Sequence, residues 1–372
     1  MDSKTAVETK RPRPLLMMPL RRCGSHALRL RMNFNPEFHS PYPLHIVDFM
    51  PLVPLYGDLD DDRAYFRLVV DVVGLQAVSM VKWPQMVFDP VEIFERLRHE
   101  PRSVHRIVWE LLLRSGEQSG AKIVMDKSLD SVHYAGDLMR LFPDMLFLNV
   151  VRDPRGQVAS MNRAIIHDFD SALNARTWVR AHDAARALLE RYPERSLTVR
   201  YEDFLTDQEA TLRTICSFVG IEFLPAMLDV AHSPEARKIA TMSALWASNC
   251  FAPIAANADK FKQQLAPDDI RMIETLARDH MHTYGYELMT AADAVVTEAS
   301  FEAARIRSDG ARLAAWRELE QTNFRDYILR KARADYLAQL RARLEQGARE
   351  SGGSARAPGK LDELNEAFNV TD

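Results

Sequence analysis

The sequence predicts an α/β fold of three layers, in which a mostly parallel central sheet carries helices on both faces and a C-terminal helical extension follows. Two observations support this prediction. Short apolar runs alternate along the chain with longer segments at helical spacing, which is the order of parallel strands joined by crossover helices. The clearest run, "MLFLNVV" at residues 145–151, is almost wholly apolar, as expected of a strand buried on both faces.

The composition narrows the class of protein. The 372 residues are 47% hydrophobic and 27% charged, as in an ordinary globular protein, and the formal net charge of −4 provides no overall cationic field for nucleic acid. The chain has only Cys23, Cys216 and Cys250, widely spaced, which argues against a disulfide framework or a structural zinc and for a reducing compartment. No apolar run is long enough to span a membrane, and the N-terminus does not resemble a signal peptide. We therefore expect a cytoplasmic protein.

The first elements follow in order from the N-terminus. Residues 1–13 are polar, and we expect them to be flexible. The run "LLMMPL" at residues 15–20 predicts a short buried strand, with a turn over 22–25 and a short helix over 26–32. The next segment, residues 34–66, should be an irregular wall across the front of the fold, because it contains Pro36, Pro41, Pro43, Pro51 and Pro54.

The middle of the chain continues the alternation. Residues 77–89, "AVSMVKWPQMVFD", and residues 121–128, "AKIVMDKS", both contain strand-like runs. The remaining predicted elements are helical spacing over 131–143, the strand at 145–151, helical spacing over 157–193, a strand within 195–205, and a helix over 207–221 that stops at Gly220.

The last quarter of the chain has a different character. Residues 300–346 read as an amphipathic helix whose apolar positions are spaced by four, namely Phe324, Ile328, Ala332, Tyr336, Leu340 and Leu344. Such a helix packs either on the body of the protein or on a second subunit, so a homodimer through it stays open. The small and polar residues after it predict disorder. We therefore divide the chain into residues 1–13, a main domain at 14–290, a helical extension at 291–346 and a disordered tail at 347–372.

Three basic residues each follow the end of a predicted strand: Arg22, Lys127 and Arg152. The carboxyl ends of parallel strands meet at one edge of a sheet, where ligands bind. The stretch "RRCGSHA" at residues 21–27 adds a loop of small residues before a helix, which is the geometry of a phosphate cradle. It is not a Walker A loop, because its cation precedes Gly24 and Ser25-His26 follows. We expect an anion-binding site at this edge.

This loop, with its cation, Gly24 and Ser25, resembles the 5′-phosphosulfate loop of sulfotransferases that use 3′-phosphoadenosine 5′-phosphosulfate (PAPS). The stretch "VVRDPRGQVASMNR" is similar to the 3′-phosphate motif of that family, in which an arginine closes a strand and a serine follows eight residues later; Arg152 and Ser160 occupy those places. Further similar segments are "MDKS", "VRYEDFL" and residues 256–288. The resemblance covers about residues 15–288 and implies a P-loop-like fold.

The resemblance also implies an activity, which is in-line transfer of a sulfuryl group from PAPS to a hydroxyl or amine of a small-molecule acceptor, without a metal. Arg22 would neutralise the leaving group, and Lys127 would lie near the sulfuryl group. Arg152 and Ser160 would bind the 3′-phosphate. The residues expected around the 5′-phosphate are Arg22, Cys23, Gly24, Ser25, His26 and Ala27.

The sequence departs from the family where an acceptor base is expected. Relatives often have a catalytic glutamate after the first helix, whereas this region reads "HSPYPLHIVDF" with Tyr42 near that place. Our first choice is His45, because a neutral imidazole can accept an alcohol proton near pH 7. Glu37, His26, Asp48 and His133 stay open as alternatives. The C-terminal glycine-rich loop of the family is missing, which leaves Lys260 and Lys262 as further donors.

Some of these residues could have purely structural roles, and the sequence also allows functions other than sulfuryl transfer. Arg21 could be a solvated charge, Asp153 and Arg155 could only shape a turn, and Cys23 suits small filler better than a nucleophile. A kinase using ATP would need a Walker lysine, which is missing, although Asp126 ends a strand and could hold a metal. A non-catalytic nucleotide-binding or assembly protein on the same scaffold also stays open.

Overall fold

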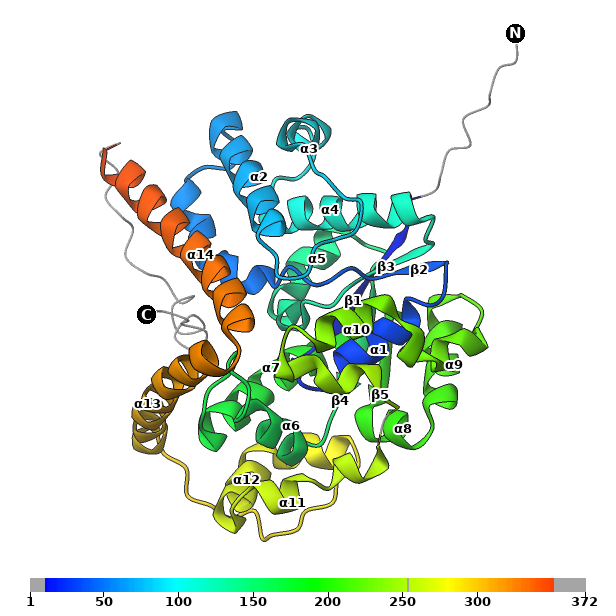
Figure 1. Cartoon of the computed structure of the whole chain (residues 1–372), viewed down its shortest axis with the longest axis vertical. Helices are drawn as coiled ribbons and strands as arrows, with labels where there is room; N and C mark the ends of the chain where they lie inside the picture. Colours follow the sequence, from blue (N-terminus) through cyan, green and yellow to red (C-terminus); the bar gives the residue numbers. More distant parts are fainter. Residues whose placement is uncertain (1–10, 253, 351–372) are drawn as a thin grey trace.

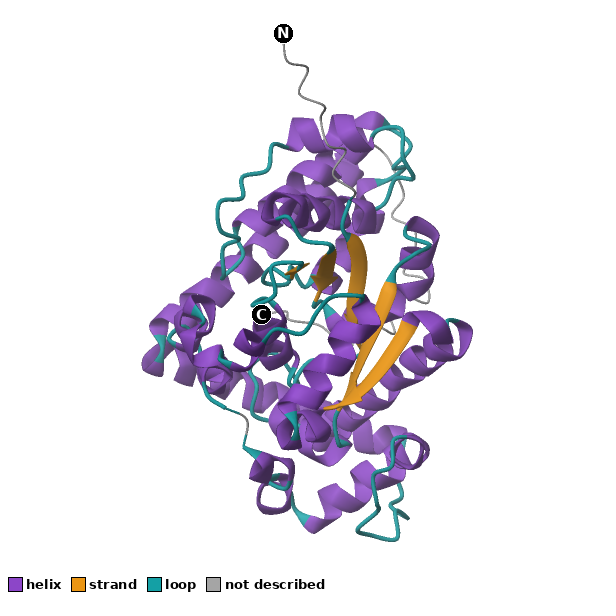
Figure 2. Ribbon diagram, turned by 90° about the vertical axis from the view of Figure 1, so that its right-hand side faces the viewer, coloured by secondary structure: helices purple, strands orange, loops and turns teal. Residues whose placement is uncertain are grey.

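The computed structural model describes residues 11–252 and 254–350. Its described part contains a five-stranded sheet in the order β2-β3-β1-β4-β5, in which every pair of neighbours is parallel. Figure 2 shows the strands at the centre with helices around them. The prediction of an α/β fold with a parallel central sheet is confirmed. The strands are β1 (Arg13–Met18), β2 (Phe38–His39), β3 (Ile123–Asp126), β4 (Leu146–Val151) and β5 (Ser196–Arg200).

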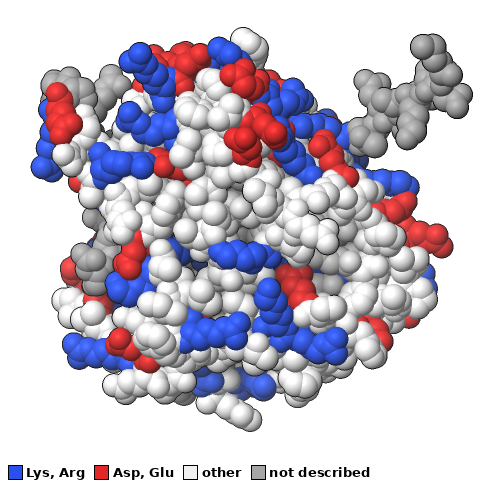
Figure 3. Space-filling view, turned by 45° about the horizontal axis from the view of Figure 1, so that its top comes forward, with Lys and Arg blue, Asp and Glu red and all other residues white. Residues whose placement is uncertain are grey.

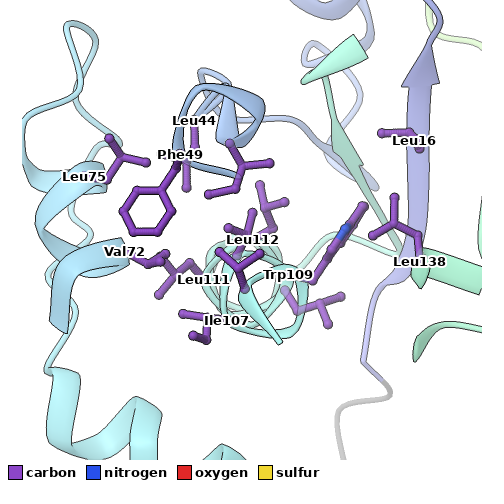
Figure 4. Close-up of a cluster of buried hydrophobic side chains, with 14 of the residues drawn as sticks. Leu16, Leu44, Phe49, Val72, Leu75, Ile107, Trp109, Leu111, Leu112 and Leu138 are labelled. Atoms are coloured by element: carbon purple, nitrogen blue, oxygen red, sulfur yellow. The ribbon is translucent and has the colours of Figure 1, made fainter. Parts of the chain in front are cut away.

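Alternation along β1 produces the layers. Leu16 and Met18 belong to one hydrophobic core together with Trp109, whereas Leu15 and Met17 belong to another together with Leu28. Successive side chains of a strand point to opposite faces, so an apolar run must be covered on both sides. Figure 4 shows the first of these cores, with Trp109 between Leu16 and the helices beyond.

Helices cover both faces of the sheet (Figure 1). The first core is built with α2 (Asp62–Ala77), α3 (Pro90–Leu97), α4 (Val104–Ser119), α5 (Ala135–Leu141) and α7 (Ser171–Arg191). The second is built with α1 (Ser25–Met32), α8 (Tyr201–Thr206) and α9 (Gln208–Val219). Further helices are α6 (Pro154–Met161), α10 (Pro234–Ala240), α11 (Phe261–Gln264) and α12 (Pro267–Thr283). The 3₁₀ helices are η1 (Ile46–Tyr56), η2 (Leu129–Tyr134), η3 (Pro193–Arg195), η4 (Pro225–Leu228), η5 (Val230–His232), η6 (Ala244–Cys250) and η7 (Ala255–Ala258).

One predicted strand is wrong. Residues 77–89 form no strand: Ala77 ends α2, and residues 78–89 connect it to α3 as a loop. Val81, Trp83 and Phe88 are buried, whereas Val87 is exposed. The Trp83 indole N–H donates to the carbonyl of Tyr42 at 2.7 Å. Pro84 removes a backbone donor that a sheet ladder would need. An apolar run therefore indicated burial here, but not a strand.

Other elements differ in their bounds. The helical spacing over 157–193 belongs to two helices, because Asp153 caps α6 and Asp170 caps α7 after an irregular connection. The strand within 195–205 ends at Arg200, where α8 begins. The proline-rich segment, expected to be an irregular wall, contains the short strand β2, the eleven-residue 3₁₀ helix η1 and the start of α2.

The two ends of the chain are only partly described. Residues 11–13, expected to be flexible, are held: Arg11 forms an ion pair with Glu110, and Arg13 begins β1. Residues 347–350, expected to belong to a disordered tail, are part of α14 (Phe324–Glu350). The rest of both predictions, residues 1–10 and 351–372, lies outside the described residues.

The C-terminal extension consists of two helices, α13 (Glu298–Thr322) and α14, rather than one. They separate at Asn323, whose side chain accepts a hydrogen bond from the backbone N–H of Asp326 at 3.1 Å. Leu340 and Leu344 are buried within the chain's own core, but Phe324 and Ile328 are 59% and 44% exposed. A homodimer through the exposed apolar residues Phe324 and Ile328 stays a prediction.

Among the described residues, no helix combines the length and the apolar character that a membrane crossing requires. Basic and acidic side chains alternate over the face shown in Figure 3, so neither sign dominates that surface.

Candidate active site

The loop between β1 and α1 forms a cradle of backbone amides. Arg22 and Gly24 both have left-handed backbone conformations, with φ of 73° and 83°. The first backbone hydrogen bond of α1 runs from the N–H of Leu28 to the carbonyl of Gly24 at 3.2 Å. The N–H groups of Ser25, His26 and Ala27 therefore precede the helical ladder and form the positive end of the helix dipole. Such a terminus binds anions.

Gly24 is needed for space as well as for its conformation. A Cβ atom at this position would lie 2.4 Å from the ring of Tyr201, the first residue of α8. A side chain at this position would therefore displace the aromatic ring that packs against the cradle. The loop consequently reaches its compact shape only with glycine at this position.

The two expected phosphate motifs touch each other. The Arg22 Nε donates to the hydroxyl of Ser160 at 3.1 Å, although the two residues are 138 positions apart. The Arg152 Nη1 donates to the carbonyl of Arg22 at 2.8 Å, and its guanidinium lies 4.7 Å from the ring centre of Tyr201. The ends of β1 and β4 are neighbours in the sheet, which brings these residues together.

Within the described part of the chain, the positive charges of this cluster lack partners of opposite sign. Among the described residues, no ion pair includes Arg22, Lys127 or Arg152. Lys127 is only 2% exposed, and its Nζ lies 3.5 Å from the hydroxyl of Ser25. Burial, and then the nearby Arg29, lower the pKa of Lys127 to about 7; burial, and then Arg152, lower the pKa of Arg22 to about 10. Buried cations that repel one another favour an anionic ligand.

Neighbouring basic residues are paired with carboxylates instead. Arg21 forms an ion pair with Asp130 at 2.8 Å. Arg155 pairs with Asp153 and with Glu274, each at 2.6 Å, and thereby joins the turn after β4 to α12. These arginines pair with carboxylates, whereas Arg22 and Arg152 form no ion pair with any residue that the structure describes.

Most of the candidate residues line the same cavity, which has a volume of about 1880 Å³. The guanidinium groups of Arg22 and Arg152 therefore open onto a shared cleft. The predicted residues that line it are Arg22, Gly24, Ser25, His26, Ala27, His45, Lys127, Arg152 and Ser160. Cys23 is the exception: its side chain is fully buried in the core beside Leu28, and burial raises the pKa of its thiol to about 11.

A family model described as "Sulfotransferase family" matches residues 14–225, which is more than half of the chain. The chain belongs to the sulfotransferase family. The resemblance noted in the sequence is thereby confirmed, and the P-loop-like fold that it implied agrees with the parallel sheet and the cradle after β1.

Solved structures that resemble this sulfotransferase are distant in sequence. The sulfotransferase domain of the olefin synthase from Synechococcus PCC 7002 is 20% identical, with a TM-score of 0.47 over 76% of this chain and 98% of that one. The sulfotransferase domain of the curacin biosynthetic pathway is 19% identical, with a TM-score of 0.49 over 75% and 100%. Sulfotransferase STF9 from Mycobacterium avium is 16% identical, with a TM-score of 0.43 over 75% and 78%. The comparison with curated proteins finds no match.

Only some of the candidate bases of this sulfotransferase line the cavity. His26, His45 and Asp48 line the cavity. Glu37, which pairs with Lys122 near the surface, and His133, half-buried in η2, are not among the lining residues. Burial, and then Arg21 and Lys127, lower the pKa of His45 well below its ordinary value, so its ring is neutral at pH 7. Burial and Lys127 do the same to the pKa of His26.

The remaining sequence candidates are divided as well. Lys260 lines the cavity, whereas Lys262, paired with Asp259 at 2.7 Å, does not. Asp126, considered as a metal ligand of a kinase, accepts from the backbone N–H of Ser128 at 2.8 Å and lies outside the lining. Over residues 11–252 and 254–350, no group of three or more His, Cys, Asp or Glu side chains lies close enough to hold a metal ion.

The structure reveals roles for cavity residues to which the sequence analysis gave none or a different one. Tyr42 and Trp246 pack edge to face, with ring centres 5.6 Å apart, and His26 stacks on Tyr42 at 5.7 Å. Tyr201 lies in the segment "VRYEDFL", which was noticed as similar to the family without a role for its tyrosine. Nothing in the sequence pointed to Trp246 or to Arg333, which come from η6 and α14, beyond the matched residues 14–225.

Proposed function

We propose that the chain is a PAPS-dependent sulfotransferase that acts on a hydroxyl or amine of a small molecule. The main support for this proposal is that two groups of basic residues line one cavity. The first group is Arg22 and Lys127, and the second is Arg152 with Ser160. None of these cations has a carboxylate partner among the described residues. A ligand with anionic groups at two separate places would offset both charges.

The residues present fit such a donor. The amides of Ser25, His26 and Ala27, at the positive end of α1, suit the 5′-phosphosulfate. Arg152 suits the 3′-phosphate, because its planar fork can bind two oxygens. Ser160 accepts a hydrogen bond from Arg22 and keeps its own proton, which it can donate to the same phosphate.

When bound, the donor supplies a sulfuryl group: its bond to the phosphate oxygen breaks, a bond to the acceptor oxygen or nitrogen forms, and adenosine 3′,5′-bisphosphate leaves. The chain contributes charge and proton transfer. Arg22 and the protonated form of Lys127 offset negative charge that grows on the leaving side. His45, neutral in this cavity, takes the proton that the acceptor loses.

The acceptor side of the cavity is formed by the C-terminal part of the chain. Lining residues from this part include Trp246 of η6, Trp316 of α13, and Tyr327 and Leu337 of α14. Aromatic and aliphatic walls with a few polar groups are typical of small-molecule sites. The three free cysteines fit a reducing compartment, so we place this activity in the cytoplasm.

Calorimetry and a transfer assay test the proposal. Adenosine 3′,5′-bisphosphate should bind at least ten-fold more tightly than ATP-Mg, and labelled sulfate should pass from PAPS to members of a panel of alcohols, phenols and amines. Preference for ATP-Mg would favour the kinase. Tight binding of the bisphosphate with no turnover on any acceptor class would favour the non-catalytic nucleotide-binding or assembly protein.

A further inference from the structure

An arginine of the last helix reaches the candidate base. Arg333 lies on α14, and its Nη2 donates to the backbone carbonyl of His45 at 3.0 Å, a contact between residues 288 positions apart. The same nitrogen lies 3.0 Å from a carboxylate oxygen of Asp48, at the start of η1. Arg333, His45 and Asp48 all line the large cavity. One guanidinium therefore joins α14 to the segment that carries the base.

The backbone of His45 is in a conformation that needs such support. Its φ is 51°, in the left-handed region, which costs free energy for a residue with a side chain. Two contacts hold it. The N–H of His45 donates to the hydroxyl of Ser128, just after β3, at 3.2 Å, and the carbonyl accepts from Arg333. The backbone of His45, which carries the imidazole, is thus held by hydrogen bonds at both its N–H and its carbonyl.

Arg333 is itself held in place by the packing of α14. The hydroxyl of Tyr336 donates to the carbonyl of Asp71 in α2 at 2.9 Å, and Leu340 and Leu344 are buried against the same body. Near the other end, Asp326 accepts from the hydroxyl of Ser243 at 2.6 Å. Helix α14 is therefore attached to the main domain on both sides of Arg333.

We propose that Arg333 positions His45 for its work as the acceptor base, so that α14 completes the active site from outside the segment shared with the family. The proposal rests on the proposed function. It gives the C-terminal extension a role in the reaction rather than only in packing, and it makes Arg333 a positioning residue.

Because several charged groups surround His45, a positioning role of Arg333 should be visible in the pKa of His45. The cations that face it are Arg21 after β1, Lys127 after β3, and Arg330 and Arg333 on α14; Asp48 is the nearby acid, and His26 and Tyr42 are the other titratable neighbours. Each of the four cations lowers the pKa of His45. Loss of Arg333 should therefore raise that pKa, and the acid limb of a pH–kcat profile should move to higher pH.

The experiment compares the full-length protein with Arg333→Ala, Arg333→Lys and the control Arg325→Ala, which removes an exposed arginine of the same helix outside the cavity. Arg333→Ala should lower kcat about ten- to hundred-fold, because the base is no longer held in place. The affinity for adenosine 3′,5′-bisphosphate should not change. Arg333→Lys should recover part of kcat, and Arg325→Ala should match the parent protein.

A measurement without turnover separates this inference from the proposed function. The imidazole of His45 is followed by NMR during a pH titration of the bisphosphate complex, with His45→Asn for assignment. If the parent protein transfers sulfate but Arg333→Ala alters neither kcat nor the His45 titration, the positioning role is wrong and the function stands. If Arg333→Ala loses bisphosphate affinity and folding together with kcat, its role is structural and the inference is also wrong. If Arg333→Ala shifts the His45 titration but the parent protein transfers no sulfate, the contact between Arg333 and His45 is supported and the proposed function is refuted.

Discussion

Arg152 donates a hydrogen bond to the main-chain carbonyl of Arg22 at 2.8 Å, across 130 residues of sequence. The contact joins the turn after β4 to the loop after β1, so the positions of Arg152 and of this loop depend on each other. With the proposed donor, this contact would relate the group that binds the 3′-phosphate to the loop that binds the 5′-phosphosulfate.

Replacing Arg152 with alanine should weaken donor binding. Loss of a charge-assisted phosphate contact costs about 1.5–3 kcal/mol, which corresponds to about a ten- to hundred-fold rise in the Kd of adenosine 3′,5′-bisphosphate. Calorimetry measures it, with Arg186→Ala, an exposed arginine of α7, as the matched control. Unchanged affinity in a folded Arg152→Ala protein would show that this arginine does not hold the 3′-phosphate.

Gly24→Ala should disrupt the cradle. The new Cβ would lie 2.4 Å from the ring of Tyr201 at a φ of +83°, so we expect a loss of about 1–3 kcal/mol in stability together with weaker bisphosphate binding. Gly136→Ala is the control, because nothing lies within 4 Å of its Cβ position in α5. That change should stabilise the protein by about 0.5–1 kcal/mol. Equal melting temperatures for the two variants would contradict the tight approach of Tyr201.

Donor affinity should depend on pH through Lys127. Burial and the neighbouring Arg29 lower the pKa of this lysine to about 7 in the free protein. Below pH 7 the ammonium is already charged when the anion arrives; above pH 7 it must first take up a proton, so affinity falls by up to about ten-fold per pH unit. Lys127→Arg keeps its charge throughout, and the fall should disappear from calorimetric titrations between pH 6 and about 9. The same fall in both proteins would assign it to another group.

The buried part of α14 should contribute strongly to stability. Leu340→Ala removes a side chain that is 4% exposed, and such truncations cost about 2–5 kcal/mol. Ile328→Ala, on the same helix but 44% exposed, should cost much less. Urea denaturation followed by circular dichroism compares the two. Similar midpoints for both variants would mean that α14 does not pack on the main domain in solution.

Local chemistry made part of the site predictable. A strand, a glycine with a left-handed backbone and a helix N-terminus are neighbours in the chain, so the stretch "RRCGSHA" is enough to predict the amide cradle. The same holds for the turn from Arg152 to Ser160 around α6. Cys23 shows the limit of such reading: a side chain inside a binding loop can point into the core, and its neighbours in sequence do not decide which way it points.

Apolar runs were a weaker guide. They located β1, β3, β4 and β5, but the run at 77–89 is a loop of which only some apolar side chains, such as Val81 and Trp83, are buried, in a core built with helices. The break between α13 and α14 depends on one asparagine, which helical spacing does not reveal.

By itself, the sequence determined the layered α/β fold, the amide cradle and the residues of the two basic motifs, because each of these follows from residues adjacent in the chain. Only the tertiary structure decided that the two motifs share one cavity, that Trp246 and Tyr42 form a wall of it, and that Arg333 holds His45. The physical reason is that contacts between distant segments follow from the packing of whole helices on the sheet, and the spacing of residues within one segment carries no record of that packing.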